Sequence, residues 1–175
     1  PRITYEVRDV SFQFKSGDIG IRNIDLAEEQ GKLIGIMGAS GAGKTTLLNV
    51  LSGTEKPTTG QVLVNGYDLH YDDENELEGV IGVIPQDDLL IEELTVFENL
   101  YYNAKLCFRD KSEEEINNLV EETLRSLGLY DRRHLKVGSP LNKMISGGQR
   151  KRLNIALELI REPGILFVDE PTSGL

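Results

Sequence analysis

The first half of the chain carries short runs of apolar residues between turn-forming residues, which is the pattern of β-strands. Residues 3–14 (ITYEVRDVSFQF) predict an opening strand, and residues 21–31 (IRNIDLAEEQG) predict another short strand and a turn. Residues 32–38 (KLIGIMG) form a continuous apolar run, which predicts a strand buried on both faces. Two further strands are predicted at residues 59–69, which include an Asn65-Gly66 turn, and at residues 79–86.

The middle of the chain has helical periodicity and repeated helix-start signals. Residues 44–53 predict a short helix. Capping boxes, in which Ser or Thr is followed three residues later by Glu or Gln, predict helix starts at Thr95, Ser112 and Ser146. Residues 165–170 (ILFVDE) return to a strand-like apolar run. The whole pattern predicts an α/β protein whose sheet core comprises residues 1–86 and 163–175, with a helical lobe at residues 87–162.

Composition narrows the class of protein. The 175 residues are 39% hydrophobic and 27% charged, which is typical of a soluble globular protein. The formal net charge of −10 argues against a nucleic-acid-binding protein, because phosphate contacts require a basic face. No apolar run approaches the length of a membrane-spanning helix. The single cysteine, Cys107, excludes a disulfide framework and favours a reducing compartment.

A phosphate-binding loop is the first chemical signal. GASGAGKT fits the pattern GxxxxGK[ST] without a gap, and an apolar run precedes it while a predicted helix follows. Its glycines allow successive backbone N–H groups to converge on a phosphate, and the helix start adds its positive end. Lys44 is predicted to neutralise the β- and γ-phosphates, and Thr45 to ligate Mg²⁺. The predicted nucleotide-binding residues are Gly38, Ala39, Ser40, Gly41, Ala42, Gly43, Lys44, Thr45 and Thr46.

Acidic and amide side chains follow two of the predicted strands. The run ILFV delivers Asp169 and Glu170 to the carboxyl end of its strand, where ligands of α/β folds bind. Asp169 is predicted to hold Mg²⁺ through water, and Glu170 to polarise an attacking water. Gln86 follows the strand at residues 79–86 and can reach Mg²⁺ or water with its amide oxygen; a simple surface glutamine is the alternative.

A second anion-receiving helix start lies about a hundred residues after the first. Ser146, Gly147, Gly148 and Gln149 place a hydroxyl and two glycine N–H groups at the positive end of a helix. The basic run that follows, residues 150–152 (RKR), is interpreted as a solvated helix face rather than a nucleic-acid patch.

These motifs, in this order, resemble the nucleotide-binding domain of ATP-binding-cassette (ABC) proteins. The segments GASGAGKTT, Gln86, ISGGQRKR and ILFVDEPTSGL carry the resemblance, which covers essentially the whole chain. QDDLLIEELTVFENL, SGGQRKRLNIALELI and DEPTSGL look most like transporters of the G subfamily and their bacterial relatives. The resemblance implies a P-loop ATPase core sheet with an antiparallel β region and an inserted helical lobe.

The family resemblance also implies roles for residues and partners. Gln86 becomes the Q-loop glutamine, Ser146 to Gln149 the signature motif, Asp169 the magnesium-linked aspartate and Glu170 the catalytic glutamate. Phe14 falls where the family places an aromatic that stacks on adenine; Phe12 is the weaker candidate, and both can instead be core residues. The resemblance further implies ATP and Mg²⁺ as ligands, a head-to-tail dimer with a second nucleotide-binding domain, and the transmembrane domains of a transporter as partners. It implies that this domain lies on the cytoplasmic side of the cell membrane.

Other classes remain open at the level of sequence. A soluble ABC ATPase, either ribosome-associated or of the DNA-repair type, is the main alternative; the DNA-repair type carries a long coiled coil between Q-loop and signature, and residues 87–145 are too short for one. A P-loop kinase or GTPase has no use for the SGGQ motif.

The chain stops inside EPTSGL, and we expect a C-terminally truncated fragment. The family's D-loop aspartate and switch histidine would follow Leu175. Neither His70 nor His134 can replace that histidine, because both precede the strand at residues 165–170. We therefore expect the fragment to bind nucleotide but hydrolyse it poorly.

Overall fold

The computed structural model describes residues 2–71, 77–139, 141–142 and 144–169. It divides into two compact units, Pro1–Gly82 with Gly164–Phe167 and Val83–Pro163 with Val168–Leu175. Each unit is described separately below.

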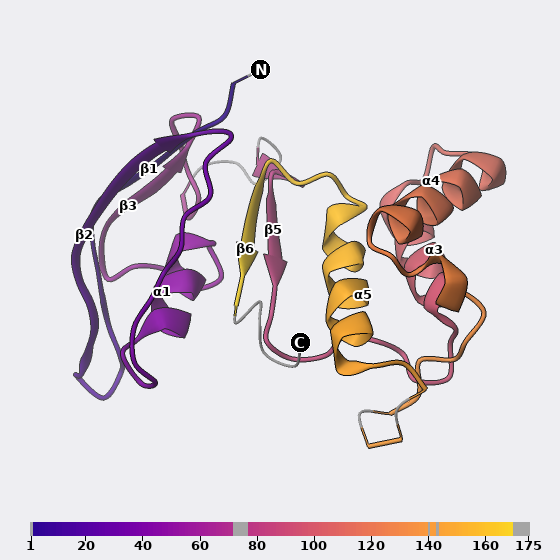
Figure 1. The fold of residues 1–175 in the computed structure, drawn as a ribbon. Helices are drawn as coiled ribbons and strands as arrows, with labels where there is room; N and C mark the ends of the chain where they lie inside the picture. The colour runs from indigo at the N-terminus through magenta and orange to yellow at the C-terminus, as the bar shows by residue number, and fades with distance from the viewer. Residues whose placement is uncertain (1, 72–76, 140, 143, 170–175) are drawn as a thin grey trace. The chain divides into compact units, whose positions relative to one another are not determined.

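The first unit is built on an antiparallel sheet that helix α1 covers (Figure 1). The sheet has the order β2-β1-β3-β4, formed by β1 (Thr4–Gln13), β2 (Ile19–Glu29), β3 (Thr59–Val64) and β4 (Tyr67–Asp68). The β3–β4 connection is the predicted Asn65-Gly66 turn, in which both residues have a positive φ (51° and 84°). The antiparallel β region expected from the sequence is therefore confirmed.

Apolar side chains on one face of this sheet pack against helix α1 (Lys44–Leu51). Val7, Val10 and Val62 are buried there with Val50 of the helix. The hydroxyl of Tyr5 donates to the backbone oxygen of Leu51 at 2.6 Å, which satisfies a polar group that would otherwise be costly to bury. Burial raises the pKa of Tyr5 far above its usual value, so this hydroxyl stays protonated.

The second unit is helical. It contains α3 (Val96–Cys107), α4 (Glu113–Ser126), a short 3₁₀ turn η1 (Tyr130–Arg132) and α5 (Gly147–Leu159). One apolar core joins the three helices, and its fully buried members are Val96, Leu100, Ala104, Val120, Leu124, Leu129, Val137, Leu153 and Ala156. The helices predicted for the middle of the chain are therefore present.

All three predicted capping boxes are present. Thr95, Ser112 and Ser146 each accept a hydrogen bond from the backbone N–H three residues later, and the Glu or Gln at that position accepts one in return. Each box satisfies two of the N–H groups that a helix start leaves without partners.

Strands β5 (Ile81–Ile84) and β6 (Ile165–Val168) form a two-stranded sheet. The N–H of Ile165 donates to the oxygen of Val80 at 2.9 Å, and the N–H of Asp169 donates to that of Ile84 at 3.1 Å. Residue numbers increase in the same direction along both strands from the first of these bonds to the second, so the strands are parallel. The strands predicted at residues 79–86 and 165–170 are present as the shorter strands Ile81–Ile84 and Ile165–Val168, and Glu170 lies outside the described residues.

The strand predicted at residues 32–38 is not formed. These residues have no regular secondary structure, and the side chains of Leu33 and Met37 are 99% and 95% exposed. A continuous apolar run becomes a buried strand only where neighbouring strands accept its backbone hydrogen bonds. Within the described part of the chain, no strand pairs with residues 32–38, so the prediction of a doubly buried strand was wrong for this structure.

Candidate functional site

The phosphate loop is an exposed turn that leads directly into helix α1. Gly43 is the N-cap of the helix and has φ 92°, a left-handed conformation that costs glycine little and other residues more. The amine of Lys44 donates to the backbone oxygens of Gly38 at 2.5 Å and Ala39 at 2.9 Å. An ammonium group has three donors, so Lys44 can bond its own loop and still donate to a phosphate. The loop thus holds the Lys44 ammonium against its own backbone, at the start of a helix whose first N–H groups lack intrahelical partners.

Two threonines follow Lys44 in the first turn of α1. Thr45 is exposed and Thr46 is half-buried. The exposed hydroxyl of Thr45 is a suitable oxygen ligand for Mg²⁺, which takes few protein ligands and keeps several waters.

Phe14 lies next to this helix start. A Cβ placed on Gly20 would be 2.8 Å from Cε2 of Phe14 and 3.2 Å from Cγ2 of Thr46, so both side chains lie against the backbone of Gly20. Phe14 is 43% exposed, so part of this residue is accessible to a ligand. Phe12 instead packs against the buried core of the first unit and meets Phe14 edge-on at 5.2 Å. The geometry therefore favours Phe14 over Phe12 for contact with a base.

The signature residues form the start of α5 in the second unit. Ser146 Oγ accepts from the N–H of Gln149 at 3.1 Å, and the Gln149 side chain accepts from the N–H of Ser146 at 2.8 Å. The N–H groups of Gly147 and Gly148 occupy the first turn, where α-helices leave donors unsatisfied. Ile145, just before the cap, is buried in the helical core and anchors this start.

Residues 150–152 are not the solvated face predicted from the sequence. Arg150 and Lys151 are only 6% and 7% exposed. Lys151 donates to the backbone oxygen of Asp169 at 3.4 Å, and Arg152 donates to that of Leu127 at 3.1 Å. The prediction was wrong because segments distant in sequence supply acceptors to these cations, which a local charge pattern does not reveal.

Arg150 also forms an ion pair that the sequence analysis missed. Its Nε donates to Oδ2 of Asp88 at 2.7 Å. Asn154, one turn after Arg150 on α5, donates to Oδ1 of Asp88 at 3.2 Å. The only sequence signal was the four-residue spacing of Arg150 and Asn154, which puts both on one face of the helix.

Gln86 and Asp169 follow the carboxyl ends of β5 and β6. The N–H of Asp169 is bonded to Ile84, so both residues leave the two-stranded sheet at the same edge. This edge is where α/β folds bind ligands. The side chain of Gln86 is exposed and that of Asp169 is half-buried. Glu170 lies outside the described residues, and a magnesium site that combines Thr45, Gln86 and Asp169 stays a prediction.

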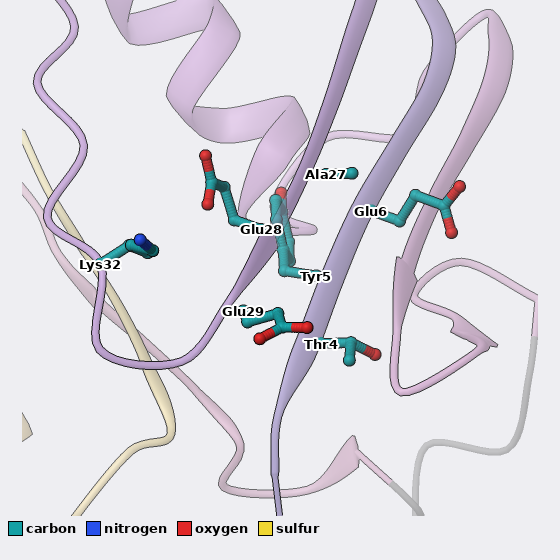
Figure 2. A pocket seen from close by; sticks show the side chains of 7 residues that line it. All are labelled: Thr4, Tyr5, Glu6, Ala27, Glu28, Glu29 and Lys32. Carbon is teal, nitrogen blue, oxygen red and sulfur yellow. The ribbon is translucent and has the colours of Figure 1, made fainter.

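A hollow of about 400 Å³ lies elsewhere in the first unit, between β1 and β2 (Figure 2). Its lining includes Glu6, Glu28, Glu29 and Lys32, so carboxylates outnumber cations around it. Carboxylates repel phosphate oxygens. The hollow is therefore unsuited to nucleotide phosphates, and none of the predicted site residues lines it.

Comparisons with known proteins identify the family of the chain. The family described as ABC transporter matches residues 21–173. The chain is 44% identical over 146 residues to the ABC-type transporter claG of Penicillium crustosum, which covers 83% of this chain and 19% of that protein. It is 38% identical to ABC transporter G family member 23 of Arabidopsis thaliana, over 99% of this chain and 28% of that protein.

A solved structure has the same fold. It is the ATP-binding cassette MJ0796, described as dimeric, in a post-hydrolysis state and bound to ADP and Pi. The TM-score is 0.79 with 31% sequence identity, over 98% of this chain and 75% of that one. The fold is therefore the α/β P-loop fold of ABC ATPase domains, as the sequence predicted.

These matches establish the family: the chain belongs to the ABC transporter family and corresponds to its nucleotide-binding region. It spans 16% to 28% of the length of the first three curated relatives. Among the described residues, no helix has both the length and the apolar character needed to cross a bilayer.

Proposed function

We propose that this chain binds ATP with Mg²⁺ at its phosphate loop, and that the complete protein hydrolyses ATP to ADP and phosphate to drive transport across a membrane. The observation that carries the proposal is the pair of anion-receiving helix starts, one at Lys44 on α1 and one at Ser146 on α5. Each presents N–H groups and a polar side chain at the positive end of a helix.

The chain's own residues divide the binding work. Lys44 and the N–H groups of residues 38–44 hold the β- and γ-phosphates, while Phe14 stacks on the base. Thr45, Gln86 and Asp169 are the proposed Mg²⁺ ligands, directly or through water. When bound, Mg²⁺ withdraws charge from the β- and γ-oxygens. Carboxylate, amide and hydroxyl oxygens are ligands that this cation accepts, so the donor set fits.

The signature residues serve the nucleotide of a second nucleotide-binding domain. Ser146, Gly147 and Gly148 donate to the γ-phosphate held by the partner's phosphate loop, while Gln149 keeps the helix start capped. The dimeric state of the ABC structure with the same fold supports this pairing. Glu170 is the proposed general base for water, and Gln86 helps to orient that water.

The names of the relatives support transport, because the curated proteins with the same region are ABC transporters. We place the domain at the cytoplasmic side of a membrane, in contact with the transmembrane domains of a transporter. A soluble ABC ATPase is not favoured by these relatives. Slow turnover by residues 1–175 alone stays a prediction.

Replacing Lys44 with alanine tests the phosphate loop. A lost charge-assisted hydrogen bond costs about 1.5–3 kcal/mol, or roughly 10- to 150-fold in affinity. Titration of the variant with a fluorescent ATP analogue should show this loss, whereas Lys15→Ala, which removes an exposed lysine of the same unit, should bind like the wild type. Unchanged affinity in Lys44→Ala, with the fold intact by circular dichroism, would contradict the assignment.

A further inference from the structure

Asp88 connects the segment after Gln86 to helix α5. It stands two residues after Gln86, and its carboxylate is only 29% exposed. One oxygen accepts from Arg150 Nε at 2.7 Å. The other accepts from Asn154 Nδ2 at 3.2 Å and from the N–H of Leu90 at 2.9 Å. The carboxylate thus has three partners, Arg150, Asn154 and the N–H of Leu90, and it is held in one orientation.

Asn154 also accepts a hydrogen bond from the same segment. Its side-chain oxygen accepts from the N–H of Leu89 at 3.0 Å, and its amide also donates to the backbone oxygen of Arg150 at 3.0 Å. Residues 88 and 89 are therefore bonded to α5, Asp88 through its side chain and Leu89 through its backbone N–H. All these atoms belong to the second unit.

Arg150 lies in the first turn of α5, and its N–H donates to the oxygen of Ser146 at 2.9 Å. Its guanidinium also donates to the backbone oxygens of Val137 at 2.9 Å and Gly138 at 2.7 Å. The side chain is 7% exposed, so its charge depends on these acceptors and on Asp88 rather than on water. Ser146 therefore starts a helix whose first turn is fixed to the loop before it and to the segment after Gln86.

We propose that Asp88, Arg150 and Asn154 are positioning residues that hold Gln86 and the signature start in one fixed arrangement. The inference rests on the proposed function of Gln86 and Ser146. In a closed dimer, both Gln86 and Ser146 contact γ-phosphates. Because the link between them is rigid, a movement of Gln86 towards its phosphate also determines how Ser146 is oriented. Nucleotide capture by the phosphate loop in the first unit does not use this link.

The expected signature is a loss of turnover without a loss of nucleotide affinity. Asp88→Asn keeps the shape of the side chain but removes the charge that Arg150 faces. Small misplacement of reacting groups lowers rates by about 10- to 100-fold, so we expect kcat of the full-length ATPase to fall by that factor. The affinity for an ATP analogue should stay within about twofold of wild type, because no contact with the nucleotide is removed. A lost hydrogen bond to the nucleotide would lower the affinity by more than this. Asp88→Glu, which keeps the charge, should recover part of the rate.

Glu121→Gln is the matched control. It removes an ion pair with Arg125 on α4 that is exposed and lies in the same unit. Exposed ion pairs contribute little, so kcat and nucleotide affinity should both match wild type. If Asp88→Asn keeps the wild-type kcat, the inference is overturned.

Asp88→Asn, Arg150→Gln and the double variant form a double-mutant cycle. If the two residues act as one unit, the double variant should lose no more kcat than the worse single variant. Additive losses of kcat would overturn the link, as would a fall in kcat fully explained by the unfolded fraction. Failure of the proposed function would look different, because the wild-type protein itself would neither bind nor hydrolyse ATP.

Discussion

Replacing Ser146 with alanine has a matched control within the same chain. Ser146 and Ser112 both cap a helix with nearly identical backbone angles, φ −68° and ψ 162° for Ser146 and φ −65° and ψ 163° for Ser112. Their hydroxyl oxygens accept from the N–H three residues later at 3.1 and 3.2 Å. Both side chains are exposed. Each alanine variant should therefore lose a similar free energy of capping, about 1 kcal/mol.

Of these two serines, only Ser146 is proposed to contact a nucleotide. A hydroxyl that accepts at a cap still carries a proton to donate, so Ser146 can cap α5 and bond a γ-phosphate at once. Its removal costs one hydrogen bond to a charged group, about 1.5–3 kcal/mol. If this bond is stronger in the transition state, kcat should fall by roughly 10- to 150-fold. Ser112→Ala should leave kcat unchanged.

The assay compares both variants in the full-length protein. Hydrogen exchange of the Gln149 and Glu115 amides reports the lost caps and should increase to a similar extent at the two sites. Phosphate release at saturating ATP reports kcat. Ser146→Thr keeps a hydroxyl and a good N-cap, and should retain more activity than Ser146→Ala. Equal kcat in Ser146→Ala and Ser112→Ala would refute the proposed contact with phosphate.

Three further outcomes are expected. Leu124→Ala, in the core of the helical unit, should lower the unfolding free energy by about 2–5 kcal/mol in urea, whereas Leu106→Ala at an exposed site should change it little. Phe14→Ala should weaken ATP and ADP binding alike, by about 1–3 kcal/mol in a titration, because both share the adenine; a loss in Phe12→Ala alone would contradict the assignment. Burial acts to raise the pKa of Asp88, but hydrogen bonds from the Leu90 N–H, Arg150 and Asn154, with the Arg150 charge, outweigh it and hold that pKa below its usual value. A carboxyl with a lowered folded-state pKa stabilises the fold above its unfolded-state pKa, and this contribution is lost as the pH falls through the folded-state pKa. The unfolding free energy of the wild type should therefore fall more steeply in acid than that of Asp88→Asn. Equal slopes of unfolding free energy against pH would contradict this.

The sequence by itself determined the features that depend on neighbouring residues. The phosphate loop, the three capping boxes and the Asn65-Gly66 turn each involve residues within a few positions of one another, so their geometry follows from local chemistry. The helical periodicity in the middle of the chain likewise indicated that helices form there. The order of these motifs was sufficient to indicate the family.

Only the tertiary structure decided which apolar and charged residues are buried. Residues 32–38 have the composition of a buried strand, yet they are exposed, because burial requires strands and helices elsewhere in the fold to pack on them. The sequence predicted that Arg150 and Lys151 are solvated, yet both are buried. Asp88 and the backbone of distant segments supply acceptors for their charged groups. The local sequence indicates what kind of contact a residue favours. Only the folded chain determines whether another segment supplies that contact.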